Sequence, residues 1–162
     1  MTYRAPWDTA VKFVTAGVVC LLSVMAVWYW LREAFPLWLK IAVTVLFLFI
    51  LIAAWMYRPV KYVVDEGNLV IERPVRSKII SLRSIVSIRR VKNAELGTLI
   101  RMWGSGGLFG YYGKFRSTRM GRMTLYATNR ANRVLIETDD GDLILISPEH
   151  PERFINDLAV RN

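Results

Sequence analysis

Two long uncharged segments near the start of the chain constrain its fold more than any other feature. Residues 13–31 and residues 41–57 contain no charged side chain, and the apolar residues 37–39 extend the second segment past Lys40. At ~1.5 Å of rise per residue, each segment is long enough as an α-helix to cross the ~30 Å hydrocarbon core of a bilayer. Neither segment has the polar stripe that a surface helix of a soluble protein keeps. We therefore expect transmembrane helices over residues 13–31 and 37–57.

The connection between the two segments is short, because only residues 32–36 separate them. So short a loop predicts an antiparallel hairpin, with both chain ends on the same side of the membrane. The loop side carries Arg32 and Lys40, and the opposite side carries a larger number of cations, which begin with Arg4, Lys12 and Arg58. By the positive-inside rule, both termini are expected in the cytoplasm.

From residue 58 onward the sequence changes to short apolar runs separated by turn signals. Glu66-Gly67-Asn68 and Asp139-Asp140-Gly141 are typical of tight hairpin turns, and residues 122–128 alternate between the two faces of a strand. We predict about seven strands, followed by a helix over residues 151–160. The expected fold class is a transmembrane α-hairpin (residues 1–57) followed by a mainly-β barrel or sandwich (residues 58–162) closed by the C-terminal helix. Because helices do not alternate with strands, a doubly wound nucleotide-binding fold is disfavoured.

The stretch GSGGLFGYYGKF, residues 104–115, raises the question of a phosphate-binding loop. A P-loop ends in Gly-Lys-Ser/Thr, but Phe115 follows Gly113-Lys114, and Leu108 stands where the first glycine of that motif belongs. We interpret the glycines as structural. Positive φ angles at the first three would let the chain bend, and the last two would relieve crowding in a strand; they are Gly104, Gly106, Gly107, Gly110 and Gly113.

An apolar loop in the same region is a candidate contact surface. Trp103, Leu108 and Phe109 carry side chains that are favourable both at a bilayer interface and in the groove of a protein partner. We keep both alternatives open beside the structural role of the glycines.

Basic residues supply the second candidate surface. The chain has 22 Lys and Arg against 13 Asp and Glu, a net charge of +9. One cluster consists of Lys114, Arg116, Arg119 and Arg122, and another contains Arg89 and Arg90. Such clusters either bind an anionic leaflet or form a solvated surface, and the sequence does not decide between the two. Nucleic acid is disfavoured as a partner, because no base-reading helix or RNA-binding motif is present.

Catalytic and metal-binding patterns are not found in the sequence. Cys20 is the single cysteine, so an intrachain disulfide and a cysteine-based zinc site are both excluded. His150 is the single histidine, and Asp139, Asp140 and Asp142 lack the spacing of a calcium loop. We therefore expect no catalytic residue, no metal, no cofactor and no small-molecule substrate.

The order of these features resembles the bacterial pleckstrin-homology-like (PH-like) domain proteins. The resemblance covers residues 58–158 and is carried by the glycine-aromatic stretch, by LYATNRANRVLIET (residues 125–138) and by SPEHPERFINDL (residues 147–158). It implies a seven-stranded PH-like domain closed by a C-terminal helix, in a protein of the bacterial inner membrane and without catalytic residues. Eukaryotic PH domains bind phosphoinositides largely through a basic first hairpin loop, whereas here that loop contains Asp65 and Glu66, which argues against inositol phosphate recognition.

The function expected from the sequence is binding rather than catalysis. We expect an integral protein of the bacterial cytoplasmic membrane whose cytoplasmic domain binds or assembles a protein partner, or copies of itself. An alternative is the binding of anionic lipid headgroups by the basic face. A further alternative is an accessory subunit of an enzyme or transporter.

Overall fold

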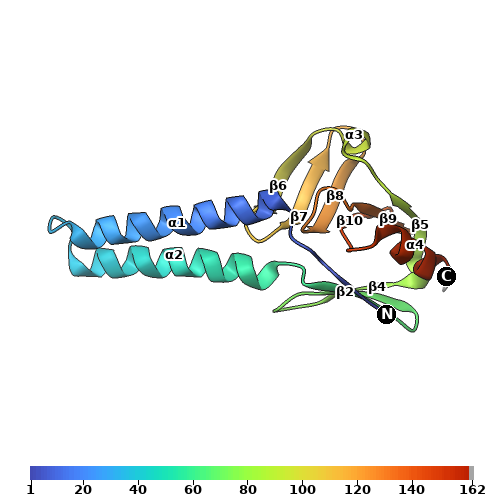
Figure 1. Ribbon diagram of the computed structural model, residues 1–162, viewed down its shortest axis with the longest axis horizontal. Helices are drawn as coiled ribbons and strands as arrows, with labels where there is room; N and C mark the ends of the chain where they lie inside the picture. Colours follow the sequence, from blue (N-terminus) through green and yellow to red (C-terminus); the bar gives the residue numbers. More distant parts are fainter. Residues whose placement is uncertain (161–162) are drawn as a thin grey trace.

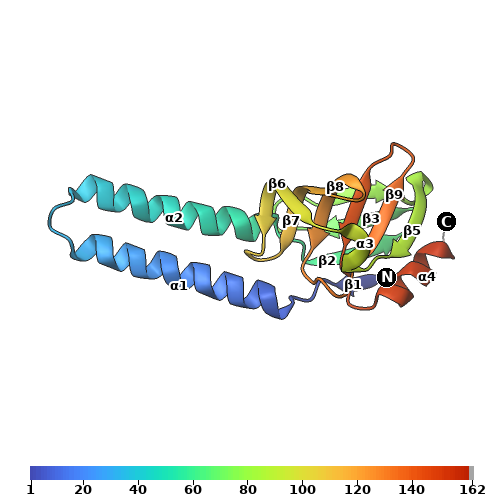
Figure 2. The same ribbon diagram turned by 90° about the horizontal axis from the view of Figure 1, so that it is seen from above.

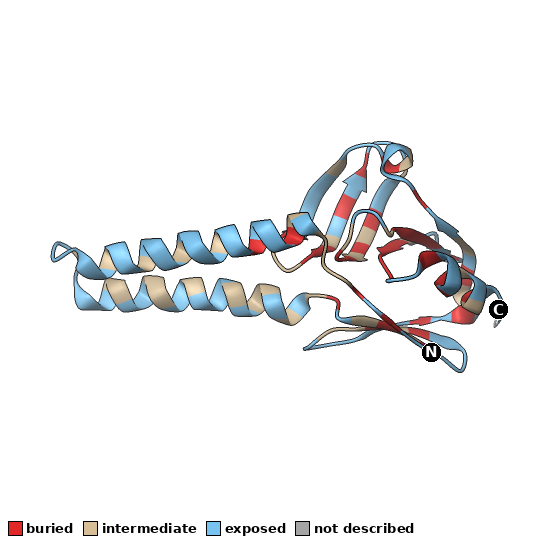
Figure 3. Ribbon diagram, in the orientation of Figure 1, coloured by how far each residue is buried: buried red, intermediate tan, exposed pale blue. Residues whose placement is uncertain are grey.

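The computed structural model describes residues 1–160 and consists of a helical hairpin attached to a β domain (Figure 1). Helices α1 (Thr9–Leu31) and α2 (Leu37–Tyr57) run antiparallel, and both return to the domain (Figure 2). Both helices are long and apolar enough to cross a membrane. Their residues are exposed or half-buried, apart from Val11 and Thr15 in the first turns of α1, which are buried (Figure 3). The predicted helical hairpin is therefore confirmed.

The β domain contains two separate sheets. The first is antiparallel and has the strand order β1-β2-β3-β4, with the bounds Thr2–Arg4, Lys61–Asp65, Asn68–Glu72 and Lys78–Ser81. A 3₁₀ turn, Leu82–Ser84, leads into the second sheet. The second sheet has the order β5-β9-β10-β8-β7-β6, with the bounds Ile85–Arg90, Val134–Thr138, Leu143–Ile146, Gly121–Ala127, Tyr111–Ser117 and Leu99–Gly106. Its strands pair antiparallel except β8 and β10, which are parallel.

Two short helices complete the domain. Helix α3 (Asn93–Leu96) lies between β5 and β6, and α4 (Pro151–Ala159) follows the last strand. The predicted mainly-β domain with a C-terminal helix is confirmed, and of the two predicted architectures the open arrangement of two sheets is the one found, because they do not close into a barrel.

The described residues form ten strands, against the predicted seven, and two of the additional strands gave no sequence signal. Strand β1 has only three residues, too few for an alternating pattern, and it precedes the hairpin although it pairs with β2 at Tyr3 and Tyr62. Strand β6 is exposed at five consecutive positions. Neither of its faces is buried there, so no alternation of apolar and polar residues marks it in the sequence. A strand at the edge of a sheet is not obliged to show that alternation.

Tyr62 links the two sheets through the larger of two apolar cores. Its ring is fully buried beside Phe154 of α4. Its hydroxyl group donates to the backbone oxygen of Tyr126 in β8 at 2.6 Å and accepts from the backbone nitrogen of Ser147 at 3.1 Å. Burial raises the pKa of Tyr62 to about 12. The hydroxyl therefore stays protonated and joins β2 to β8 and to the end of β10, two neighbouring strands in the middle of the second sheet.

The second core connects the hairpin to the domain. It lies on one face of the six-stranded sheet and contains Tyr111, Phe115, Leu125 and Leu145. Val11 of α1 belongs to this cluster and is fully buried. The beginning of α1 is therefore part of the domain interior, although most of the helix is exposed.

The glycine-aromatic stretch forms the β6–β7 hairpin and leads into strand β8 rather than opening a helix. Gly104 and Gly113 face each other across the two strands with φ angles of 109° and 115°. A Cβ atom on Gly104 would collide with the carbonyl oxygen of Tyr112 and would lie 2.8 Å from Cα of Gly113. Gly107 and Gly110 also have positive φ angles, but Gly106 does not, contrary to the prediction that it bends the chain in this way. Gly106 continues strand β6 in an ordinary extended conformation.

Replacing Gly104 tests the close approach of β6 and β7. We expect Gly104→Ala to lower the free energy of unfolding by about 2 kcal/mol or more, because it combines a positive φ angle with a collision against the backbone. Gly106→Ala is the matched control, since its Cβ atom would meet only the Arg101 side chain, with Cδ at 3.7 Å and Nη1 at 3.9 Å. Thermal unfolding of the full-length variants in detergent micelles measures the difference. Equal midpoints for the two variants would contradict the role assigned to Gly104.

Candidate functional site

Asp8 controls the junction at which the chain leaves the β domain and enters α1. Its Oδ1 atom accepts from the backbone nitrogen of Val11 at 2.7 Å and caps the helix, and its Oδ2 atom accepts from the backbone nitrogen of Arg130 at 3.1 Å. The backbone nitrogen of Asp8 donates to the carbonyl oxygen of Thr128 at 3.0 Å. One residue therefore holds the start of the hairpin against the loop that follows β8.

The β6–β7 turn packs against α1. The backbone nitrogen of Phe109 donates to Thr15 Oγ1 at 3.0 Å, and the Phe109 ring lies 6.0 Å from the ring of Trp7. Val14 fills the space that a side chain on Gly107 would need. The turn that sequence analysis proposed as a contact surface thus contacts the chain's own helix, and both Leu108 and Phe109 are half-buried.

Aromatic and cationic side chains join α2 to the domain. The Tyr112 hydroxyl of β7 donates to the backbone oxygen of Ala54 at 2.5 Å. The guanidinium carbon of Arg58 lies 5.4 Å from the ring of Trp7 and 5.2 Å from the ring of Trp55, so this cation is placed between two aromatic groups. Burial lowers the pKa of Arg58. Both helices are therefore held by side chains of the domain or its linkers.

The exposed face of strands β6, β7 and β8 is the first candidate binding surface. Directly paired residues share a face of a sheet, and the register pairs Ile100 with Arg116, Arg116 with Arg122, and Trp103 with Lys114. These five residues, all exposed, define what we call the outer face. Within residues 1–160, its three cations form no ion pair.

The outer face is turned toward the hairpin. Side chains two positions apart on a strand point to the same side, so Tyr112 shares the face of Lys114 and Arg116. Tyr112 is the residue that reaches Ala54 in α2. In agreement, β6 and β7 are the strands of the second sheet that lie nearest the hairpin (Figure 2). The outer face therefore looks along the helices rather than away from them.

The other basic residues named from the sequence do not join this face. Arg89 pairs with Glu95 at 2.7 Å and Arg90 pairs with Glu152 at 2.9 Å. Arg119 donates to the backbone oxygen of Ala94 in α3 at 2.8 Å. The cluster Lys114, Arg116, Arg119 and Arg122 is thus brought together except for Arg119, which sits in the β7–β8 turn.

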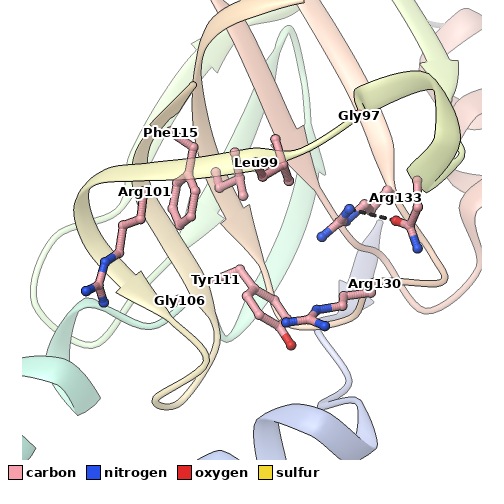
Figure 4. A pocket seen from close by; sticks show the side chains of 10 residues that line it. Gly97, Leu99, Arg101, Gly106, Tyr111, Phe115, Arg130 and Arg133 are labelled. Atoms are coloured by element: carbon pink, nitrogen blue, oxygen red, sulfur yellow. Dashed lines mark hydrogen bonds between the residues drawn. The ribbon is translucent and has the colours of Figure 1, made fainter. Parts of the chain in front are cut away.

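A pocket on the opposite face of β6, β7 and β8 is the second candidate site (Figure 4). We call it the arginine pocket, because Arg101, Arg130 and Arg133 line it. Its volume is about 460 Å³, and its apolar lining includes Leu99 and Phe115. Figure 4 shows Arg130 and Arg133 on one side, beside Tyr111, and Arg101 on the other. The residues that line the pocket include no Asp or Glu.

Two polar atoms in this pocket lack hydrogen-bond partners among the described residues. They are Arg133 Nε, whose residue is 5% exposed, and the hydroxyl oxygen of Tyr111. Arg133 is held in place by Asn93, whose Oδ1 atom accepts from Arg133 Nη1 at 2.7 Å. The guanidinium carbon of Arg130 stands 4.7 Å from the centre of the Tyr111 ring. Burial and the neighbouring Arg130 both lower the pKa of Arg133, and burial raises the pKa of Tyr111.

Sequence reasoning missed the arginine pocket because its cations are far apart along the chain. Arg101 lies on β6, whereas Arg130 and Arg133 lie in the loop between β8 and β9. The run NRANR, residues 129–133, contained the one signal in the sequence. It places two arginines in a short polar loop beside apolar strand segments. Metal binding has no such geometric support, as no group of three or more potential ligands occurs among the described residues.

Comparison with known proteins identifies a family. A family model described as "Bacterial PH domain" matches residues 60–162, which is more than half of the chain. No curated protein and no solved structure matches. The matched region includes β2 to α4 and both candidate sites, whereas β1 and the hairpin precede it.

The junction at Asp8 gives a testable prediction. Asp8→Ala removes the helix cap and the acceptor for Arg130, so we expect the free energy of unfolding to fall by about 1–2 kcal/mol. Asp8→Asn keeps an oxygen that caps the helix and is expected to lose less than half of that amount. Chemical denaturation of both full-length variants in the same micelles provides the comparison. An equally large loss for Asn would assign the effect to the charge or to the second acceptor, which receives the Arg130 backbone nitrogen, rather than to capping.

Proposed function

We propose that this chain, which belongs to the bacterial PH domain family, is a non-enzymatic binding module anchored in the cytoplasmic membrane by α1 and α2. Membership of the family supports a role in binding lipid or protein. The length and apolar surface of the two helices support the anchoring. The excess of cations at the domain side of the hairpin supports a cytoplasmic position for both termini and for the PH domain.

The observation that carries the proposal is the set of unpaired cations on the outer face. Lys114, Arg116 and Arg122 have no acidic partner within residues 1–160, and the face that carries them is turned toward the hairpin. With the helices in a bilayer, these groups would face its headgroups. A cation near an anionic leaflet gains ~1 kcal/mol, and a tryptophan such as Trp103 is favourable at the same depth. We therefore infer that the outer face rests on anionic lipid headgroups.

Rigid attachment makes weak contacts sufficient for this orientation. The contacts of Asp8, Thr15, Tyr112 and Arg58 hold the domain beside the ends of both helices. Because the helices already hold the domain at the membrane, the outer face is at a high effective concentration relative to the lipid headgroups. Each weak contact between the outer face and a headgroup then needs no separate encounter from solution.

Charge reversal on the outer face tests this function. The probe is Ile100→Cys in a Cys20→Ser background, labelled with a polarity-sensitive fluorophore, in nanodiscs of phosphatidylcholine with or without phosphatidylglycerol. We expect a blue shift of the emission only in the anionic discs. Arg116→Glu with Arg122→Glu should remove it, because two attractions of ~1 kcal/mol each become repulsions.

The control for that experiment carries the same change of charge elsewhere. Arg83→Glu with Arg153→Glu alters the turn before β5 and helix α4, which lies at the end of the domain away from the hairpin loop (Figure 1). These variants should keep the blue shift. A shift of equal size in neutral discs, or one that survives reversal on the outer face, would count against headgroup binding.

A protein partner is the second candidate function, and a different observation favours it. Strand β6 is an edge of the second sheet, and its side chains at Ile100, Met102 and Trp103 are 54%, 55% and 78% exposed. An edge strand offers backbone donors and acceptors to another strand, and exposed apolar groups add affinity. A partner protein, including an enzyme or transporter to which this chain is an accessory subunit, or a second copy of the chain, would assemble along β6.

Photo-crosslinking distinguishes the two edges of the sheet. A photoreactive amino acid in place of Trp103 should give one discrete protein adduct in native membranes. The same amino acid in place of Val86, which is 69% exposed on the opposite edge strand β5, should give none. Mass spectrometry identifies the adduct. Lipid adducts alone at position 103 would favour the headgroup function, and similar protein adducts at both positions would contradict a specific assembly surface.

A further inference from the structure

We infer that the arginine pocket binds a small amphiphilic anion, in which a carboxylate or phosphate group is attached to an apolar body. This site is distinct from the outer face, because it occupies the opposite side of β6, β7 and β8. This inference goes beyond the proposed function, because binding of headgroups by the outer face does not require a ligand in the arginine pocket.

The side chains that line the pocket carry positive charge only. Three arginines line it, and no acidic residue does. The carboxylate of Asp8 acts on Tyr111 and Arg133 through its charge, but its oxygens accept hydrogen bonds from the backbone nitrogens of Val11 and Arg130. Nearby Glu95 and Glu152 are paired with Arg89 and Arg90. One carboxylate near three arginines leaves the pocket with a positive charge, which an anion from outside the chain would offset.

Burial makes the missing partner significant. A buried polar group without a hydrogen bond is costly, and a buried charge without a partner is more so. Arg133 is almost fully buried and its Nε atom has no acceptor among residues 1–160, although Asn93 holds its Nη1 atom. This nitrogen is closed off as the side chain stands, so an acceptor in the pocket would reach it only after a small shift of Arg133, and would then offset that cost.

The donors are already oriented for an anion. Asn93 fixes the guanidinium plane of Arg133, and the ring of Tyr111 lies against the guanidinium of Arg130. The planar guanidinium group of arginine matches the geometry of carboxylate and phosphate oxygens. The Tyr111 hydroxyl, beside Arg130 in Figure 4, has no hydrogen-bond partner among residues 1–160 and would add a third donor after a similar small shift. These three side chains form the proposed anion subsite.

The rest of the pocket calls for an apolar body. A volume of about 460 Å³ is much larger than a single phosphate or carboxylate group. Leu99, Phe115 and Leu125 line the remainder, and ligand sites in proteins commonly combine such surfaces with a few oriented polar groups. Arg101 stands on the far side and would meet a second polar group of the ligand (Figure 4).

Binding is measured on the full-length protein in neutral phosphatidylcholine nanodiscs. The probes are phenyl phosphate and 4-phenylbutyrate, with 4-phenylbutanol as the uncharged analogue and inorganic phosphate as the anion without an apolar body. We expect both aromatic anions to raise the unfolding midpoint in a saturable way, inorganic phosphate to bind more weakly, and the alcohol to have no effect. Equal responses to alcohol and anions would overturn the proposal.

Variants assign the effect to the pocket. Arg130→Gln, Arg133→Gln and Tyr111→Phe should each weaken binding of phenyl phosphate, by roughly tenfold or more for the arginines. Arg83→Gln, which removes an exposed cation elsewhere, should leave the affinity unchanged. If buried Arg133 proves necessary for folding, exposed Arg130 decides the question. Unchanged affinity in Arg130→Gln and Tyr111→Phe would overturn the proposal.

The source of the anion is found by competition. When phosphatidylglycerol replaces part of the phosphatidylcholine, a ligand drawn from the membrane would compete with phenyl phosphate, and Arg130→Gln would abolish that competition. Undiminished affinity in anionic discs would instead support a soluble ligand. A result in which only a peptide with a free terminal carboxylate binds would contradict a small-molecule site. None of these outcomes depends on the charges of the outer face.

Discussion

The hydrogen bonds of the Asp8 carboxylate connect the two parts of the molecule, and the positions of both candidate sites depend on them. One oxygen caps α1 through Val11, and the other holds the backbone of Arg130, at the entrance to the arginine pocket. Before Asp8, strand β1 is paired with β2; after it, Val11 is buried in the second core. A carboxylate that accepts from backbone amides makes stronger hydrogen bonds than a neutral group would. The direction of the hairpin and the shape of the pocket therefore have a common support.

Strand β7 shows how one element serves two surfaces. Alternate side chains of a strand point to opposite faces, so Lys114 and Arg116 lie on the outer face while Tyr111 and Phe115 line the pocket. Gly113 stands between them and allows β6 to approach closely at Gly104. A bulkier residue at either glycine would separate the strands, and both surfaces would change together. The glycines thus act on function through the backbone rather than by binding a phosphate.

Much of the architecture could be predicted from local sequence patterns. The uncharged segments identified the hairpin because a membrane-length apolar helix has few alternatives. The turn at residues 66–68 and the turn at residues 139–141 identified two hairpins, which the register of β2 with β3 and of β9 with β10 matches. The absence of Ser or Thr after Lys114 correctly argued against a P-loop, since the stretch forms a β-hairpin. Each of these predictions used residues that are neighbours along the chain.

By itself, the sequence determined the apolar hairpin, the mainly-β domain, the closing helix and the surplus of positive charge. Only the tertiary structure decided where that charge is paired and where it is free. Arg89 and Arg90 meet glutamates, and Arg119 meets a backbone oxygen, whereas Arg116 and Arg122 form no ion pair within residues 1–160. It also decided that β1 pairs with β2, although the whole hairpin separates these strands in the sequence. Likewise, it decided that Arg101 and Arg133 line one pocket. The physical reason is that sheet register and helix docking bring together residues far apart in the chain, and no local period records such pairings.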